Sequence, residues 1–277
     1  MDKFREFAYR HPIMTSIIAI GIFTCLTEIP QLEPLLLNYF DKQSASYLAG
    51  TIIQGLTSLL LVIVMAYFKL IKTVGFSKPP EWKQVLIAWP ILALSLLASW
   101  SLFTGVLVID MSKPLHILFY MLVYLSTGFY EEILCRGLVL SLLLNAWGQT
   151  KKGLSWAVII SSLLFGIIHL VSLLLGRISF LASLTQVGYA TFIGVFFAAC
   201  ILRNRSLWPA IIGHAIFNMS SDLNTIAIGG TFGEISTTNS TLSDALSTII
   251  IMFPFLVYGL FILRKVQPLN NSTANIT

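Results

Sequence analysis

The sequence predicts an all-α polytopic membrane protein with about eight transmembrane helices in one bundle. Only 10% of its 277 residues are charged and 56% are hydrophobic, whereas a soluble domain carries about a quarter charged residues. The mean hydropathy is +0.85, and the length suits one compact bundle. The net charge of +5 gives no reason to expect a nucleic-acid partner, because in a membrane chain the distribution of Lys and Arg matters more than their sum.

Apolar runs separated by polar turns are the expected spans, so the lipid bilayer is the first expected partner. In chain order the runs cover residues 13–29, 46–70, 82–109, 115–147, 154–175, 184–202, 207–222 and 246–263. The run at 115–147 is overlong for one crossing, and we expect it to break after Arg136. The run at 207–222 is short and unusually polar for a span.

Basic residues are distributed unequally between the two sides that these spans define. The side with both termini holds thirteen, namely Lys3, Arg5, Arg10, Lys69, Lys72, Lys78, Lys83, Lys151, Lys152, Arg203, Arg205, Arg264 and Lys265. The other side holds three, namely Lys42, Lys113 and Arg177. Because cytoplasmic loops are enriched in Lys and Arg, we expect both termini in the cytoplasm, and a plasma-membrane location if the protein is bacterial. Trp147 and Trp156 would then lie at cytoplasmic span ends, where aromatic side chains gather.

Two adjacent glutamates and an arginine lie inside the apolar run at 115–147: Glu131, Glu132 and Arg136. A charged side chain at mid-helix costs roughly 2.5–3.5 kcal/mol on insertion scales, so the two glutamates together cost about 5–7 kcal/mol. Glu132 and Arg136 are separated by four positions, and a salt bridge between them would make the helix easier to insert. A functional use is the alternative explanation for so costly a pair.

Other spans supply polar partners for these acids. His169 lies in the run at 154–175, one helical turn after Phe165, and the run at 207–222 carries His214 and Asn218 on one helix face. Each has a structural interpretation: His169 as a core histidine, Phe165 as packing, and Asn218 as an interhelical hydrogen-bonding residue. Two acids, two histidines and an asparagine on three spans together favour a functional site.

These residue types suit hydrolysis by activated water. Two adjacent carboxylates cannot both ionise cheaply, which makes one of them a candidate general base, while the other stays charged beside Arg136. Asn218 and a neutral histidine can donate hydrogen bonds to an oxyanion. Histidines together with Glu131 could instead hold a metal. The serine-hydrolase motif G-x-S-x-G and the zinc motif H-E-x-x-H are both absent from the sequence.

The order of these motifs resembles the CPBP family, also called Abi, which includes type II CAAX prenyl endopeptidases and bacteriocin-processing or immunity proteins. The similarity covers about residues 128–218 and consists of Glu131-Glu132-x-x-x-Arg136, Phe165-x-x-x-His169 and His214-x-x-x-Asn218. It implies an intramembrane glutamate protease.

By this resemblance, Glu131 and His169 would activate the water, and His214 with Asn218 would stabilise the oxyanion. Glu132 would be held by Arg136, and Phe165 would support the site. The family has also been described as a metalloprotease, so zinc held by Glu131, His169 and His214 is the alternative to the metal-free mechanism that we favour.

We therefore expect a catalytic core at 111–223, preceded by spans without a motif at 1–110. Residues 224–277 would form a polar loop, a last span and a tail within the same structural unit. The expected activity is hydrolysis of a peptide bond near the membrane, in a peptide or protein with a membrane-proximal segment, such as C-terminal or bacteriocin-like peptide processing. A catalytically silent scaffold or immunity protein is one alternative. A proton-coupled transporter is another, since buried Glu and His form proton relays.

Overall fold

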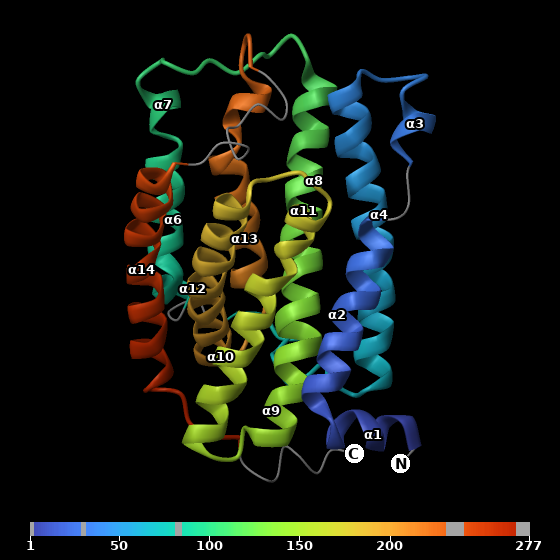
Figure 1. Ribbon diagram of the computed structural model, residues 1–277, viewed down its shortest axis with the longest axis vertical. Helices are drawn as coiled ribbons and strands as arrows, with labels where there is room; N and C mark the ends of the chain where they lie inside the picture. Colours follow the sequence, from blue (N-terminus) through green and yellow to red (C-terminus); the bar gives the residue numbers. More distant parts are fainter. Residues whose placement is uncertain (1–2, 29–31, 81–84, 231–240, 270–277) are drawn as a thin grey trace.

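A computed structural model describes residues 3–28, 32–80, 85–230 and 241–269 as a bundle of helices (Figure 1). The described residues form no strand, only an isolated bridge between Ile109 and Ala227. The predicted all-α fold is confirmed. In chain order the elements are α1 (Lys3–Arg10), α2 (Pro12–Glu28), α3 (Glu33–Leu36), α4 (Lys42–Tyr67), η1 (Leu86–Ala88), α6 (Trp89–Ala98), α7 (Trp100–Phe103), α8 (Pro114–Glu132), η2 (Ile133–Leu140), α9 (Ser141–Trp147), α10 (Lys151–Ile168), α11 (Leu170–Leu174), α12 (Phe180–Asn204), α13 (Trp208–Ser221), η3 (Leu223–Ile226) and α14 (Leu242–Leu263).

Within the described residues, six helical segments are long and apolar enough to cross a membrane. They contain α2, α4, the continuous run α8–η2–α9, α10 with α11, α12, and α14. The two other expected spans are short helices: the apolar segment Leu86–Ala98 and α13, whose 14 residues would extend only about 21 Å. The polytopic fold is therefore confirmed, but the count of eight is not. The start of the span expected at 82–109, with Trp82 and Lys83, and the tail from residue 270 lie outside the described residues.

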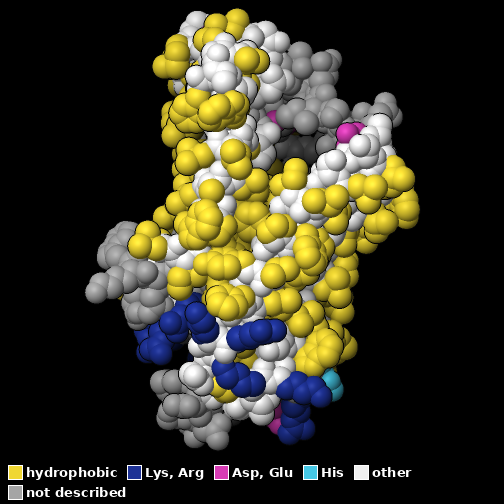
Figure 2. Space-filling model, turned by 90° about the vertical axis from the view of Figure 1, so that its left-hand side faces the viewer, with side chains coloured by type: hydrophobic (Ala, Val, Ile, Leu, Met, Phe, Trp, Pro, Cys, Tyr) yellow, Lys and Arg dark blue, Asp and Glu magenta, His cyan; other side chains and the backbone are white. Residues whose placement is uncertain are grey.

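The outer surface of the bundle is an apolar band. Figure 2 shows hydrophobic side chains over most of one face, with Lys and Arg gathered towards its lower end. Large side chains on this surface are strongly exposed, such as Leu56 on α4, Leu97 on α6 and Ile250 on α14. A soluble monomer rarely exposes so large an apolar area, whereas lipid chains cover it without cost. The surface is that of an integral, multi-pass membrane protein. Helix α1 and the end of α14 lie at the same end of the bundle (Figure 1).

The expected break after Arg136 is wrong. Residues Pro114–Trp147 form one continuous helical segment of 34 residues, which changes from α-helix to π-helix over Ile133–Leu140 and then continues as α9. All eight π-helical residues are buried. At 1.5 Å per residue the segment is about 50 Å long, and it runs the full height of the bundle (Figure 1). Wider π winding inside α-helices is frequent at functional sites, and here it begins directly after the glutamate pair.

Helix α13 approaches α8 closely at Gly128. A Cβ atom at this position would lie 2.9 Å from the carbonyl oxygen of Ile211 and 3.0 Å from the amide nitrogen of Ala215. Both neighbours are backbone atoms that cannot move aside, so only glycine fits without a shift of the helices. This contact holds His214, one residue before Ala215, against the part of α8 that carries the glutamates.

Replacing Gly128 with alanine should therefore lower the free energy of unfolding by about 1–3 kcal/mol, because the added methyl group overpacks the α8–α13 contact. Unfolding of the purified protein by SDS in mixed micelles measures this. Gly55→Ala is the matched control: Gly55 also lies within a long helix, α4, but a Cβ there meets no atom within 4 Å. Equal stability of the two variants would show that the close approach is not needed.

A polar cluster fastens the end of α13 that lies furthest from the π-helix. The Ser44 hydroxyl contacts Nδ1 of His116 at 3.0 Å, and Nε2 of His116 lies 3.3 Å from the carbonyl oxygen of Thr225 in η3. The Tyr124 hydroxyl donates a hydrogen bond to the Asp222 carboxylate at the end of α13. These contacts connect α4 and α8 to the segment after α13, so the helix that carries His214 is held at its far end.

Candidate active site

Glu132 and Arg136 form a fully buried ion pair. Nη1 of Arg136 donates a hydrogen bond to Oε1 of Glu132 at 2.7 Å, and the two side chains are only 1% and 0% exposed for Arg136 and Glu132, respectively. The guanidinium carbon also lies 4.2 Å from the centre of the Phe165 ring on α10, a cation–π contact. Oε2 of Glu132 and Nη2 of Arg136 have no hydrogen-bond partner among the described residues. The pair therefore depends on one direct hydrogen bond and on its neighbours.

His214 of α13 lies between the two glutamates. Its Nδ1 is 2.9 Å from Oε1 of Glu132, and its Nε2 is 3.4 Å from Oε2 of Glu131. Phe197 of α12 stacks on the imidazole with ring centres 5.6 Å apart, and the edge of Phe165 meets it at 5.9 Å. Each of these two nitrogen–carboxylate contacts is attractive only when a proton lies on one of its two partner atoms. The aromatic rings thus hold the imidazole where it can share protons with both carboxylates.

The two adjacent glutamates have different surroundings. Glu132 is fully buried and accepts hydrogen bonds from Arg136 and His214 at the same oxygen. Glu131 is 24% exposed and contacts only Nε2 of His214 among the described ionisable groups. Successive residues of a helix point about 100° apart, which explains why neighbours in sequence face different environments. A small molecule such as water has access to Glu131 and not to Glu132.

His169 lies at the junction of α10 and α11 and is oriented by a residue that the sequence did not single out. Its Nδ1 lies 3.2 Å from Nε2 of Gln186 on α12, and Phe165 meets its ring edge-on at 5.3 Å. An amide N–H donates, so Nδ1 acts as the acceptor and the proton of a neutral ring resides on Nε2. Gln186 is a polar side chain within the apolar run at 184–202, and this property is the signal that would have identified it.

Asn218 lies one turn beyond His214 on α13 and is half-buried. Among the described residues its amide has no hydrogen-bond partner, so the structure does not connect it to the cluster of Glu132, Arg136 and His214. Its position on the same helix face leaves the amide free to contact a ligand beside His214.

The three residues considered as alternative zinc ligands, Glu131, His169 and His214, do not converge on one point. The described residues contain no group of three or more His, Cys, Asp or Glu side chains arranged to hold a metal ion. Glu131 faces His214, whereas Nδ1 of His169 is directed to Gln186. Zinc ligands would have to meet within about 2.0–2.3 Å of one point, so these residues do not fit a metal site as arranged.

A small cavity of about 180 Å³ lies between the first half of α12 and the start of α14. Its wall includes Gln186, the partner of His169, and Tyr189, which lies within electrostatic range of Glu131. Asp244 at the start of α14 also lines it. The cavity therefore reaches from the start of α14 towards Gln186, the residue that orients His169.

These features define a class: an all-α membrane protein with a buried centre of glutamate, arginine and histidine inside its helix bundle. Residues 113–220 match the family described as type II CAAX prenyl endopeptidase Rce1-like. The predicted resemblance is confirmed for this segment, which runs from the start of α8 to the end of α13 and contains all seven predicted site residues. At family level it indicates a CAAX-type intramembrane endopeptidase. No curated protein and no solved structure gives a significant match.

Proposed function

We propose that the protein hydrolyses a peptide bond near or within the membrane with a water molecule activated by Glu131. The observation that carries this proposal is the unequal environment of the glutamate pair. The buried carboxylate of Glu132 is held by hydrogen bonds from Arg136 and His214, whereas Glu131 is partly exposed and free to accept a proton. A general base must reach the proton that it removes, and only Glu131 of the two is accessible.

The proposed steps use the residues around Glu131. Glu131 removes a proton from water, and the hydroxide attacks the peptide carbonyl to give a tetrahedral oxyanion. Nε2 of His214, 3.4 Å from Glu131, would lie within reach of that oxyanion, and the free amide of Asn218 would be the second donor. The protonated Glu131 then donates its proton to the leaving amine. His169, oriented by Gln186, would help to position the water.

We propose that the reaction needs no metal, since the residues around Glu131 do not converge as ligands. Activity should then remain within about two-fold of the untreated level after incubation with a chelator, because no proposed step depends on a bound ion. Cleavage rates of the purified protein before and after treatment with EDTA measure this. Loss of activity on chelation and its recovery on addition of zinc would overturn the metal-free mechanism.

The proposed substrates are peptides or protein tails with a membrane-proximal segment, including C-terminal or bacteriocin-like peptides. The test is cleavage of a fluorogenic peptide library by the protein purified in detergent, with His169→Ala compared with wild type. His11→Ala is the matched control, since His11 lies on the exposed surface before α2. Loss of cleavage only in the His169 variant supports the proposal. Equal cleavage by all three proteins, or none by wild type across the library, counts against it.

Replacing Gln186 with leucine should lower kcat by roughly 10- to 100-fold with little change in KM. The substitution removes the hydrogen bond that orients His169, and small misplacements of a catalytic group have effects of this size. Steady-state kinetics on the best library peptide would measure both constants. Gln43→Leu is the control, because Gln43 bonds the Thr225 carbonyl oxygen at the other polar cluster. A change in KM alone would assign Gln186 to substrate binding instead.

A further inference from the structure

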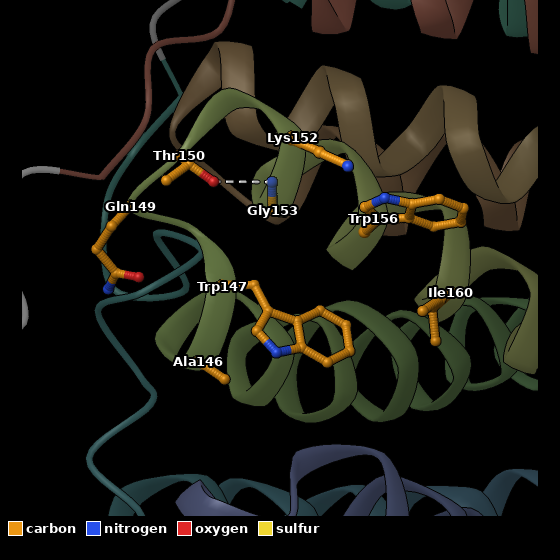
Figure 3. Close-up of a pocket in the computed structure, with 8 residues that line it drawn as sticks. All are labelled: Ala146, Trp147, Gln149, Thr150, Lys152, Gly153, Trp156 and Ile160. Atoms are coloured by element: carbon orange, nitrogen blue, oxygen red, sulfur yellow. Dashed lines mark hydrogen bonds between the residues drawn. The ribbon is translucent and has the colours of Figure 1, made fainter.

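A second and larger cavity, of about 510 Å³, lies at the turn between α9 and α10, away from the glutamate centre. Figure 3 shows the indole rings of Trp147 and Trp156 projecting into the space between the two helices, with Ile160 further along α10. None of the residues that line it takes part in the proposed hydrolysis. Its volume lies within the range of about 300–1,000 Å³ that is common for small-molecule sites.

One wall of this cavity is apolar and aromatic. Trp156 is 50% exposed, and Trp147 and Ile160 are half-buried. Exposed tryptophans are favoured at the level of lipid headgroups, where the ring contacts glycerol and the first acyl carbons and the N–H remains hydrated. This wall fits the apolar part of an amphipathic ligand.

The other wall carries a positive charge. Lys152 extends from the first turn of α10 towards Trp156 (Figure 3), and it has no ion-pair partner in the part of the chain that the structure describes. Its neighbour Lys151 is already occupied, because its Nζ donates to the carbonyl oxygens of Arg264, at 3.2 Å, and of Val266. The side chain of Thr150 accepts from the amide of Gly153 at 3.0 Å, which caps the helix. Lys152 is therefore the charge left for a ligand.

The cavity lies where the apolar band of the molecule meets its basic end. The α9–α10 turn is at the lower end in Figure 1, and Figure 2 shows Lys and Arg side chains gathered towards the lower end below the hydrophobic band. An occupant here would have its negative group among basic side chains and its apolar part against the band. A neutral lipid lacks the charge, and a soluble phosphate lacks the apolar part.

We propose that this cavity binds one anionic diacyl phospholipid. The lipid phosphate lies at Lys152, and the glycerol and first acyl carbons lie on Trp147, Trp156 and Ile160. The site is separate from the glutamate centre, so it stands whether or not the protein is a peptidase.

Native mass spectrometry of the detergent-purified full-length protein tests this, with phosphatidylglycerol and phosphatidylcholine of the same acyl chains added in turn. We expect preferential retention of one phosphatidylglycerol. Lys152→Gln should weaken this binding about five-fold, the effect of one basic residue near a lipid surface. Trp156→Ala should weaken the binding of both lipids, because both lose the apolar wall. Lys72→Gln is the control, since Lys72 is another exposed lysine on the basic side and does not line the cavity.

Three results would overturn the proposal. The first is equal retention of the two lipids by wild type. The second is an equal loss of phosphatidylglycerol binding in the Lys152 and Lys72 variants. The third is displacement of the bound lipid by excess glycerol phosphate. The last result would show that the phosphate alone is recognised.

Discussion

Glu131→Gln should lower kcat/KM by roughly 100- to 10,000-fold, the range for loss of a general base. Glutamine keeps the size of the side chain and removes the group that accepts the proton from water. Because Glu131 is partly exposed and its one ion-pair partner among the described residues is His214, at 3.4 Å, the fold should survive the change. Initial rates on a cleaved library peptide, together with the thermal unfolding midpoint in the same detergent, would show the two effects separately.

Glu33→Gln is the matched control for this substitution, since Glu33 lies in the first turn of α3, outside the candidate site. Its activity should equal that of wild type. A Glu131→Gln variant that cleaves at the wild-type rate would remove Glu131 from the mechanism, whatever the behaviour of Glu132.

Arg136→Met should lower the free energy of unfolding by about 3–5 kcal/mol, because it leaves the charge of Glu132 buried without its partner. The side chains of this pair are only 1% and 0% exposed, so neither water nor lipid headgroups can replace the guanidinium. Arg136 also lies over the ring of Phe165, and that contact is lost as well. Unfolding in mixed SDS micelles would measure the change.

The chain offers a matched control for this pair in Arg177→Met. The Arg177–Glu28 pair has a similar N–O distance, 2.8 Å, but its side chains are 55% and 31% exposed. An exposed pair contributes only about 0–1 kcal/mol. The double variant Glu132→Gln/Arg136→Met should recover part of the stability lost in Arg136→Met, because no unpaired charge remains. Similar losses for Arg136→Met and Arg177→Met would contradict the claim that burial makes the Glu132–Arg136 pair essential.

The residues that the sequence singled out were predictable because charge is costly in an apolar run. Glu131, Glu132 and Arg136 stand out from 115–147, and the i,i+4 spacing of Glu132 and Arg136 predicts the ion pair that the structure contains. His214 stands out in the same way, and it contacts both glutamates. The match to the Rce1-like family over residues 113–220 covers these positions. Outside it, α4 packs on α8 and α14 packs on α12, so the flanking helices support the matched segment.

Other features depend on three-dimensional packing and have no sequence signal of their own. The π-helix at Ile133–Leu140 replaces the break expected after Arg136, and hydrophobic periodicity over so few residues cannot distinguish the two. Phe197 stacks on His214, but in sequence it is one of many aromatic residues in an apolar span. Gln186 was detectable as a polar residue, but its contact with His169 depends on how α12 lies against α10.

The most direct test of Glu131 as the base that activates water is a single turnover in oxygen-18-labelled water, with enzyme in excess over a cleaved peptide. Mass spectrometry of the product and of an enzyme fragment containing Glu131 would locate the label. Water activation predicts one labelled oxygen in the new carboxyl group of the product and none in Glu131. Unlabelled product with labelled Glu131 would show that the glutamate attacks the peptide bond itself, and would contradict its role as a general base.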